Sequence, residues 1–155
     1  AQDHYEEALA LYRKDGVRIG IAHALQGLGL VAVERGDVVP AEQLLRECMA
    51  VQRDTADWHF LPATLDGLAG VGALRVGVSG TPAAERALRL AGAAGAIRGV
   101  LGPRHWHTEL AMRWLAPAFA ALGGPDSLAA KTAWAAGAAL SAEQAVAYAL
   151  EESDA

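Results

Sequence analysis

The chain has 155 residues, a net charge of −5 and 53% hydrophobic residues, without a basic stripe or a long uncharged apolar run. These features exclude direct nucleic-acid binding through a basic surface, and a membrane helix, which needs ~18–20 apolar residues. Alanine supplies much of the apolar share, β-branched residues are sparse, and polar and apolar residues do not alternate, so we expect an all-α protein.

The opening elements are predicted to be one helix followed by a helical hairpin. The first helix covers residues 2–14, and the hairpin pairs residues 18–35 with residues 38–53. Gly36-Asp37 separates the two helices of the hairpin, because glycine there ends the first one. The residues that share the inner faces of the hairpin are Leu25, Leu28, Gly29 and Ala32, then Ala41, Leu45 and Cys48.

The same pattern of large and small residues recurs along the chain. The first-helix set returns 40 positions later as Leu65, Leu68, Ala69 and Gly72, and the second-helix set returns 43 positions later as Ala84, Leu88 and Ala91. We therefore expect a second hairpin over residues 60–77 and 82–99. A repeat of this length is typical of stacked helical hairpins, because no single hairpin can bury its apolar face alone.

Three further helices are predicted over residues 104–122, 126–138 and 142–152. Thr81-Pro82, Gly102-Pro103 and Gly124-Pro125 are interpreted as helix starts, and Pro117 predicts a kink or break. Ser127 is read as a helix-start residue, and Ser141 with Gln144 as a capping box. We expect the three helices to cover the last open face of the stack with the large side chains of Trp106, Trp114 and Trp134.

The repeat resembles the tetratricopeptide family. The matching order is L-x-x-L-G-x-x-A…G-D…A-x-x-x-L-x-x-C, from Leu25 to Cys48, although the period of 40–43 residues exceeds the usual ~34. The segments ERALRLAGAAGAIRGVLG and WAAGAALSAEQAVAYALE resemble the carboxyl-terminal region of STAND-type regulators, such as LuxR-like or SARP-like transcription factors and cyclase-linked ATPases. The resemblance implies one domain: a right-handed stack of antiparallel hairpins over residues 1–102, closed by a helical cap over residues 103–155.

The resemblance also implies a function. The chain would be a non-catalytic interaction and sensor module that binds a partner protein, another domain or a small effector on its concave groove. By position, the groove is lined by His23, Gln26, Leu30, Val33 and Glu34, followed by Ala63, Asp66, Gly70, Ala73 and Leu74. This mildly acidic, mixed lining fits an apolar or basic helix better than a peptide carboxylate.

Catalytic chemistry is not expected from this sequence. The glycines of GLAGVG (Gly67–Gly72) lie among leucines at helical spacing and do not follow a strand, so we interpret Gly29 and its equivalent Ala69 as places where helices approach closely, with Gly27 and Gly29 giving clearance for a neighbouring backbone. Cys48 has no basic neighbour and is expected to be a buried packing thiol. No cofactor is predicted.

Two alternatives remain open at this point. His105, Trp106 and His107, with Trp134, could form a small-molecule or metal pocket among the last helices, or the groove or first helix could serve homodimerisation. The single cysteine favours a cytoplasmic protein. The opening AQDHYEEALALYRKDG lacks a methionine, and we expect the chain to be a piece of a longer protein.

Overall fold

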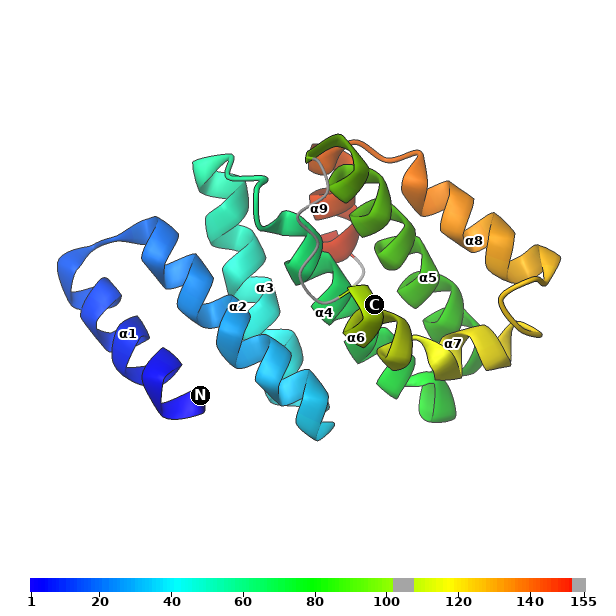
Figure 1. The fold of residues 1–155 in the computed structure, drawn as a ribbon, viewed down its shortest axis with the longest axis horizontal. Helices are drawn as coiled ribbons and strands as arrows, with labels where there is room; N and C mark the ends of the chain where they lie inside the picture. Colours follow the sequence, from blue (N-terminus) through cyan, green and yellow to red (C-terminus); the bar gives the residue numbers. More distant parts are fainter. Residues whose placement is uncertain (102–107, 152–155) are drawn as a thin grey trace.

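The computed structural model describes residues 1–101 and 108–151, and within these ranges it contains helices and no strand (Figure 1). The expectation of an all-α protein is therefore confirmed for the described part of the chain. The helices are α1 (Gln2–Asp15), α2 (Arg18–Arg35), α3 (Val38–Thr55), α4 (Leu61–Leu74), α5 (Val76–Leu101), α6 (Thr108–Trp114), α7 (Ala116–Ala121), α8 (Leu128–Ala138) and α9 (Ala142–Glu151).

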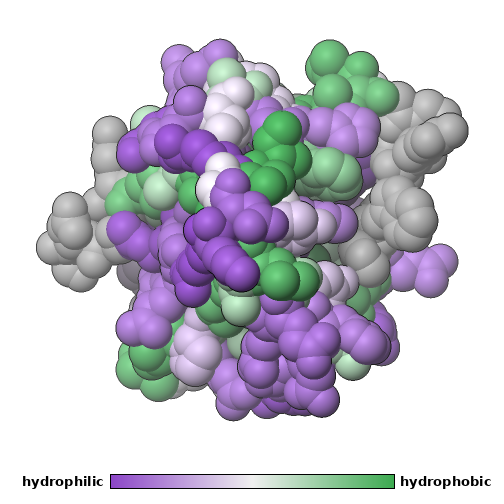
Figure 2. Space-filling view, turned by 90° about the vertical axis from the view of Figure 1, so that its left-hand side faces the viewer, coloured by the Kyte–Doolittle hydropathy of each residue, from purple (hydrophilic) through white to green (hydrophobic). Residues whose placement is uncertain are grey.

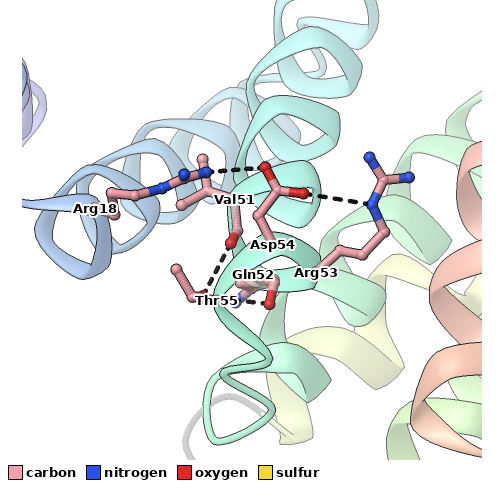
Figure 3. Close-up of polar contacts among 6 residues, drawn as sticks. All are labelled: Arg18, Val51, Gln52, Arg53, Asp54 and Thr55. Atoms are coloured by element: carbon pink, nitrogen blue, oxygen red, sulfur yellow. Dashed lines mark hydrogen bonds and ion pairs between the residues drawn. The ribbon is translucent and has the colours of Figure 1, made fainter.

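Two glycines separate the first three helices. Gly16 and Gly36 adopt left-handed backbone angles, with φ of 69° and 76°, where a side chain would be strained. The turn at Gly36 brings α3 back along α2, as the sequence predicts. Asp54 near the end of α3 then contacts Arg18 at the start of α2 at 2.9 Å and Arg53 at 3.8 Å (Figure 3), so both ends of the hairpin are tied together.

The second hairpin pairs α4 with α5. Gly80, with φ of 64° and ψ of −147°, interrupts the helical backbone inside α5. The break therefore lies one residue before the predicted start at Thr81-Pro82. Pro82 is tolerated there because the first turn after a break has no partner for its missing N–H group.

The carboxyl-terminal region differs from the expected three helices. The single helix predicted over residues 104–122 is two helices in the described part, α6 and α7, which are separated at Leu115 just before Pro117. The predicted start at Gly102-Pro103 lies outside the described residues. Gly124-Pro125 is wrong as a helix start, because α8 begins after Ser127, whose side chain accepts a hydrogen bond from the Ala130 N–H.

The capping box before α9 is confirmed. The Ser141 N–H donates to the Gln144 side chain at 2.9 Å, and the Gln144 N–H donates to the Ser141 hydroxyl at 3.1 Å. This reciprocal pair satisfies two backbone donors that a helix start otherwise leaves open.

Helix α4 lies at the centre of the packing. It contacts α2, α3 and α5 and is also covered by α6, α7 and α9. In Figure 1, α6 and α7 lie nearer the viewer and α9 lies farther away. Every residue of α4 except Ala63 and Leu74 is buried, as expected for a helix that is apolar on all sides.

The last helices therefore do more than close the end of the molecule. Only α8 packs along the outer side of α5, whereas α6, α7 and α9 fold back over α3, α4 and α5. The backbones of α5 and α8 meet at Gly92 and Gly137: a Cβ atom added at Gly92 would lie 3.2 Å from the Ala138 nitrogen, and one added at Gly137 would lie 2.8 Å from the Arg89 Cα.

None of the helices in the described ranges combines the length and apolar character that crossing a bilayer requires.

Candidate interaction surface

The residues expected to line a groove lie on α2 and α4, and helix α6 covers part of them. We define the α2/α4 face as Leu30, Val33 and Glu34 of α2 with Gly67 and Gly70 of α4. Trp114 of α6 lies on this face, because a Cβ atom added at Gly70 would be 3.2 Å from its ring and 2.8 Å from Val33. The Trp114 indole N–H also donates a hydrogen bond to the Glu34 carboxylate. The α2/α4 face thus holds α6 through Trp114, which makes one polar contact and close apolar packing.

Asp66 was expected to face an open groove, and this expectation is wrong. Its side chain is 6% exposed and forms an ion pair with Arg98 near the end of α5. Burial raises the pKa of Asp66 to about 6, while the charge and hydrogen bond of Arg98 oppose that rise. The carboxylate therefore joins α4 to α5 inside the molecule and is not available to an external ligand.

Gln26 is also buried and does not line an open surface. Its side-chain nitrogen donates to the Phe60 carbonyl and to the Thr64 hydroxyl, both at 2.8 Å. The Thr64 hydroxyl lies 3.5 Å from the Cys48 sulfur, which donates to the Ala22 carbonyl at 3.2 Å. These contacts satisfy polar groups where α2, α3 and α4 meet, so they fix the spacing of the three helices.

Cys48 has the environment of a packing residue. Its thiol is fully buried, and desolvation raises its pKa to about 11. A thiol with a raised pKa supplies almost no thiolate near neutral pH, which is the form needed for nucleophilic chemistry.

The remaining expected groove residues are split between surface and interior. His23 and Glu34 are exposed, Leu30 and Ala63 are half-buried, Leu74 is exposed, and Val33, Gly70 and Ala73 are buried. His23 stacks on Phe60 with ring centroids 5.4 Å apart, and His59 meets the edge of Phe60 at 4.7 Å. The expected open groove is therefore corrected to a face that is partly closed by α6 and partly internal.

Gly27 and Gly29 of α2 give clearance to side chains and not to a backbone, which corrects the expectation. A Cβ atom added at Gly29 would lie 2.6 Å from the Leu45 side chain, and one added at Gly27 would overlap the Tyr5 ring. Leu45 is fully buried, and the other inward-facing positions of the hairpin are also buried: Leu25, Leu28, Gly29, Ala32, Ala41 and Cys48. The glycines thus admit α1 and α3 close to α2.

Substituting leucine for Gly29 is expected to lower the free energy of unfolding by about 2 kcal/mol, because the new side chain displaces Leu45 from a filled core. Chemical denaturation followed by circular dichroism measures the change. The matched control is Gly99→Leu on α5, where an added Cβ atom meets nothing within 4 Å. Equal stability of the two variants would contradict the assigned contact.

The alternative of a metal or small-molecule pocket among the last helices gains no support from the described residues. Among the described residues, no group of three or more His, Cys, Asp or Glu side chains is placed to hold a metal ion. His105, Trp106 and His107 lie outside the described residues. Trp134 packs against the core, with its ring 6.3 Å from that of Phe119.

The outer end of the molecule, formed by α1 and the start of α2, exposes Leu11, Val17 and Ile19. Figure 2 looks onto this end and shows apolar groups separated by hydrophilic ones, not joined into one patch. Arg13 on α1 pairs with Glu47 on α3 at 2.7 Å, across the side of the molecule. Homodimerisation through α1 receives no specific support from this surface.

Sequence reasoning missed the partners of two residues that were expected to line the groove. Trp114 and Arg98 were not assigned to the groove, although Trp114 bonds Glu34 and Arg98 bonds Asp66, and both acidic residues were assigned to it. The available signal was chemical, because acidic side chains need hydrogen-bond donors. Trp114 and Arg98 both carry such donors. Searches of known protein families, curated proteins and solved structures find no match to this chain.

Proposed function

We propose that this chain is a non-catalytic protein-interaction and sensor module whose α2/α4 face binds an amphipathic helix. The observation that carries the proposal is the seating of α6 on that face, with Trp114 packed at Gly70 and hydrogen-bonded to Glu34. A helix laid on an apolar surface with one aromatic anchor is a recurring mode of peptide recognition. The proposed setting is a tetratricopeptide-like arm of a STAND-type regulator, which the sequence resemblance supports.

The short length of α6 supports exchange with a partner helix. Isolated helices shorter than about 12–15 residues are marginal in water, so the 7 residues over which α6 is described depend on their docking for stability. A longer partner helix that places a tryptophan over Gly70 would make the same contacts and bury more area. The α2/α4 face would then exchange an internal occupant for an external one.

The sensor mechanism follows from these two states. A partner that binds only when α6 has left the face shifts the population toward the open arrangement. The shift equals the difference in the partner's affinity for the two states, and the same coupling reaches any domain that responds to the position of α6.

The direct test is binding of a labelled peptide with the sequence of residues 108–121, measured by fluorescence anisotropy. Trp114→Ala in the whole chain weakens the docking of α6 on the α2/α4 face. We therefore expect the peptide to bind this variant more tightly than the unmodified chain. The control peptide carries the same Trp114→Ala change and should lose binding, because it lacks the indole that meets Gly70 and Glu34.

A second variant checks the polar contact. Adding Glu34→Leu to the Trp114→Ala chain removes the hydrogen-bond acceptor of the indole and should weaken peptide binding. The proposal fails if the peptide binds neither chain, or if its affinity is unchanged by the loss of Glu34 while circular dichroism shows both chains to be helical.

A further inference from the structure

An exposed aromatic cluster lies where α2 and α4 begin, and the proposed function does not use it. The cluster consists of His23 on α2 and of His59 and Phe60 just before α4. The Phe60 ring stacks on His23, and the His59 ring stands at right angles to it. Phe60 is 41% exposed, and both histidines are exposed as well. We call these three residues the aromatic end.

The aromatic end and the α2/α4 face belong to one continuous strip. Three pairs of residues join α2 to α4 along this strip, and the members of each pair are 37 positions apart in the chain: His23 with Phe60, Leu30 with Gly67, and Val33 with Gly70. Because every helical residue advances by the same rise, this constant offset shows that α2 and α4 run parallel and in register. The strip from Phe60 to Gly70 is therefore about 15 Å long.

The strip is apolar between its two ends. Leu30 and Ala63 are half-buried, and Gly67 has no side chain, so that a Cβ atom added there would lie 2.9 Å from Leu30. Gln26 and Asp66, which lie between the two ends in sequence, are buried and bonded within the molecule. They leave the apolar strip uninterrupted.

Polar contacts fix the backbone of the aromatic end. The buried Gln26 side chain donates to the Phe60 carbonyl at 2.8 Å, and the His59 backbone N–H donates to the Asp57 carboxylate at 3.3 Å. The Phe60 ring is therefore presented from a fixed backbone, with an imidazole ring on its face and another at its edge. Exposed aromatic rings held in this way are effective anchors for a partner, because little conformational freedom is lost on binding.

The direction of α6 shows which part of a docked helix reaches the aromatic end. In Figure 1, α2, α4 and α6 all run in the same direction, from the upper left toward the lower right. Trp114 lies against Gly70, at the opposite end of the strip from Phe60. In a partner helix that docks as α6 does, the residues before the tryptophan therefore extend toward Phe60.

We propose that the partner helix carries two anchors, a tryptophan that packs over Gly70 and an apolar side chain that packs on Phe60. The second anchor lies about eleven residues before the tryptophan, because three turns of helix span the strip and return to the same side. This inference rests on the proposed function of the α2/α4 face. It adds a spacing that distinguishes this partner from other amphipathic helices with one tryptophan.

The test measures the binding of three labelled peptides to the Trp114→Ala chain by fluorescence anisotropy. All three are helical peptides of alanine, glutamate and lysine with one tryptophan. The first has a leucine at the proposed spacing, the second has this leucine moved by two residues so that it no longer shares a side with the tryptophan, and the third has alanine instead. The first peptide should bind about tenfold more tightly than the others, because only its leucine is buried on Phe60.

Variants of the chain assign this gain to the aromatic end. Phe60→Ala should remove the advantage of the first peptide, whereas the matched control Val78→Ala, at a 93% exposed valine of α5, should leave it unchanged. His23→Ala changes an exposed side chain of the same cluster and should reduce the advantage. It decides the case in which circular dichroism shows that Phe60→Ala has lost helix.

The outcomes separate this inference from the proposed function. If the three peptides bind with equal affinity, or if the advantage of the first survives both Phe60→Ala and His23→Ala, the second anchor is overturned and the proposed function stands. If none of the three binds, the second anchor is also overturned. The peptide of residues 108–121 then shows whether the proposed function fails with it.

Discussion

Replacing Gly137 by alanine is expected to lower the free energy of unfolding by about 3 kcal/mol, because the added methyl group meets backbone and not a movable side chain. The added Cβ atom would lie 2.6 Å from the Arg89 carbonyl carbon and would overlap its oxygen. A neighbouring side chain can rotate away, but the backbone of α5 cannot move without separating from α8. Gly92→Ala is expected to have a similar cost, because its Cβ atom would overlap the Trp134 carbonyl.

Gly95→Ala is the matched control for these two variants. It lies one turn after Gly92 on α5, and its added Cβ atom would make an ordinary contact at 3.5 Å with the Trp134 ring. Alanine is favoured over glycine inside a helix by about 1 kcal/mol, so this variant should be more stable than the unmodified chain. Chemical denaturation compares the three. Equal effects at all three positions would show that α5 and α8 do not meet as closely as described.

Removing the partner of Asp66 is expected to give the second large effect. Arg98→Met leaves a buried carboxyl without its counter-ion, and breaking such pairs costs about 3–5 kcal/mol. We expect a loss of about 3 kcal/mol near neutral pH, at the lower end, because a carboxyl whose pKa is already raised to about 6 can take up a proton. Denaturation of the two chains at one pH measures this loss.

The pH dependence gives an independent check. The pKa of Asp66 is raised by folding from 3.8 to about 6, so between these values the folded chain binds more protons than the unfolded chain. Its contribution to stability is therefore greatest below pH 3.8 and falls as the pH rises toward 6, by up to about 3 kcal/mol.

Asp66→Asn isolates this contribution, because it removes the titrating group and keeps the size of the side chain. The stability of the unmodified chain minus that of Asp66→Asn should decrease across the same pH interval. In Arg98→Met, the decrease should extend to higher pH, since the positive charge that lowers the folded-state pKa of Asp66 is gone. A difference that does not vary with pH would rule out a raised pKa for Asp66.

The hairpins could be predicted from the sequence because their signals are local. The spacing of Leu25, Leu28 and Ala32 and the turn at Gly36 lie within one short segment, and the structure places α2 and α3 within two residues of the predicted bounds. Leu45 follows the turn on the second helix of the hairpin, and its side chain packs against Gly29, where a Cβ atom would leave it no room. Local spacing fixes such pairs because the turn leaves the two helices only one way to meet.

The candidate site could not be predicted in the same way, because its contacts join distant segments. Trp114 and Glu34 are 80 residues apart, and Arg98 and Asp66 are 32 apart. Gly92 and Gly137 resemble any other helical glycine until the crossing of α5 and α8 is known. The acidic character of the α2 and α4 faces is visible in the sequence, but whether solvent or another helix covers it depends on how the chain returns after α5.

The enclosure of α4 has a consequence for how this sequence can change over time. Helices cover it on nearly every side, so almost any new side chain along its length must displace a neighbour. Leu9 is the one buried residue of helix α1, and most of the surface of this helix is open to water. Homologous chains should therefore accumulate substitutions freely along α1, while those in α4 require compensating replacements in the helices around it.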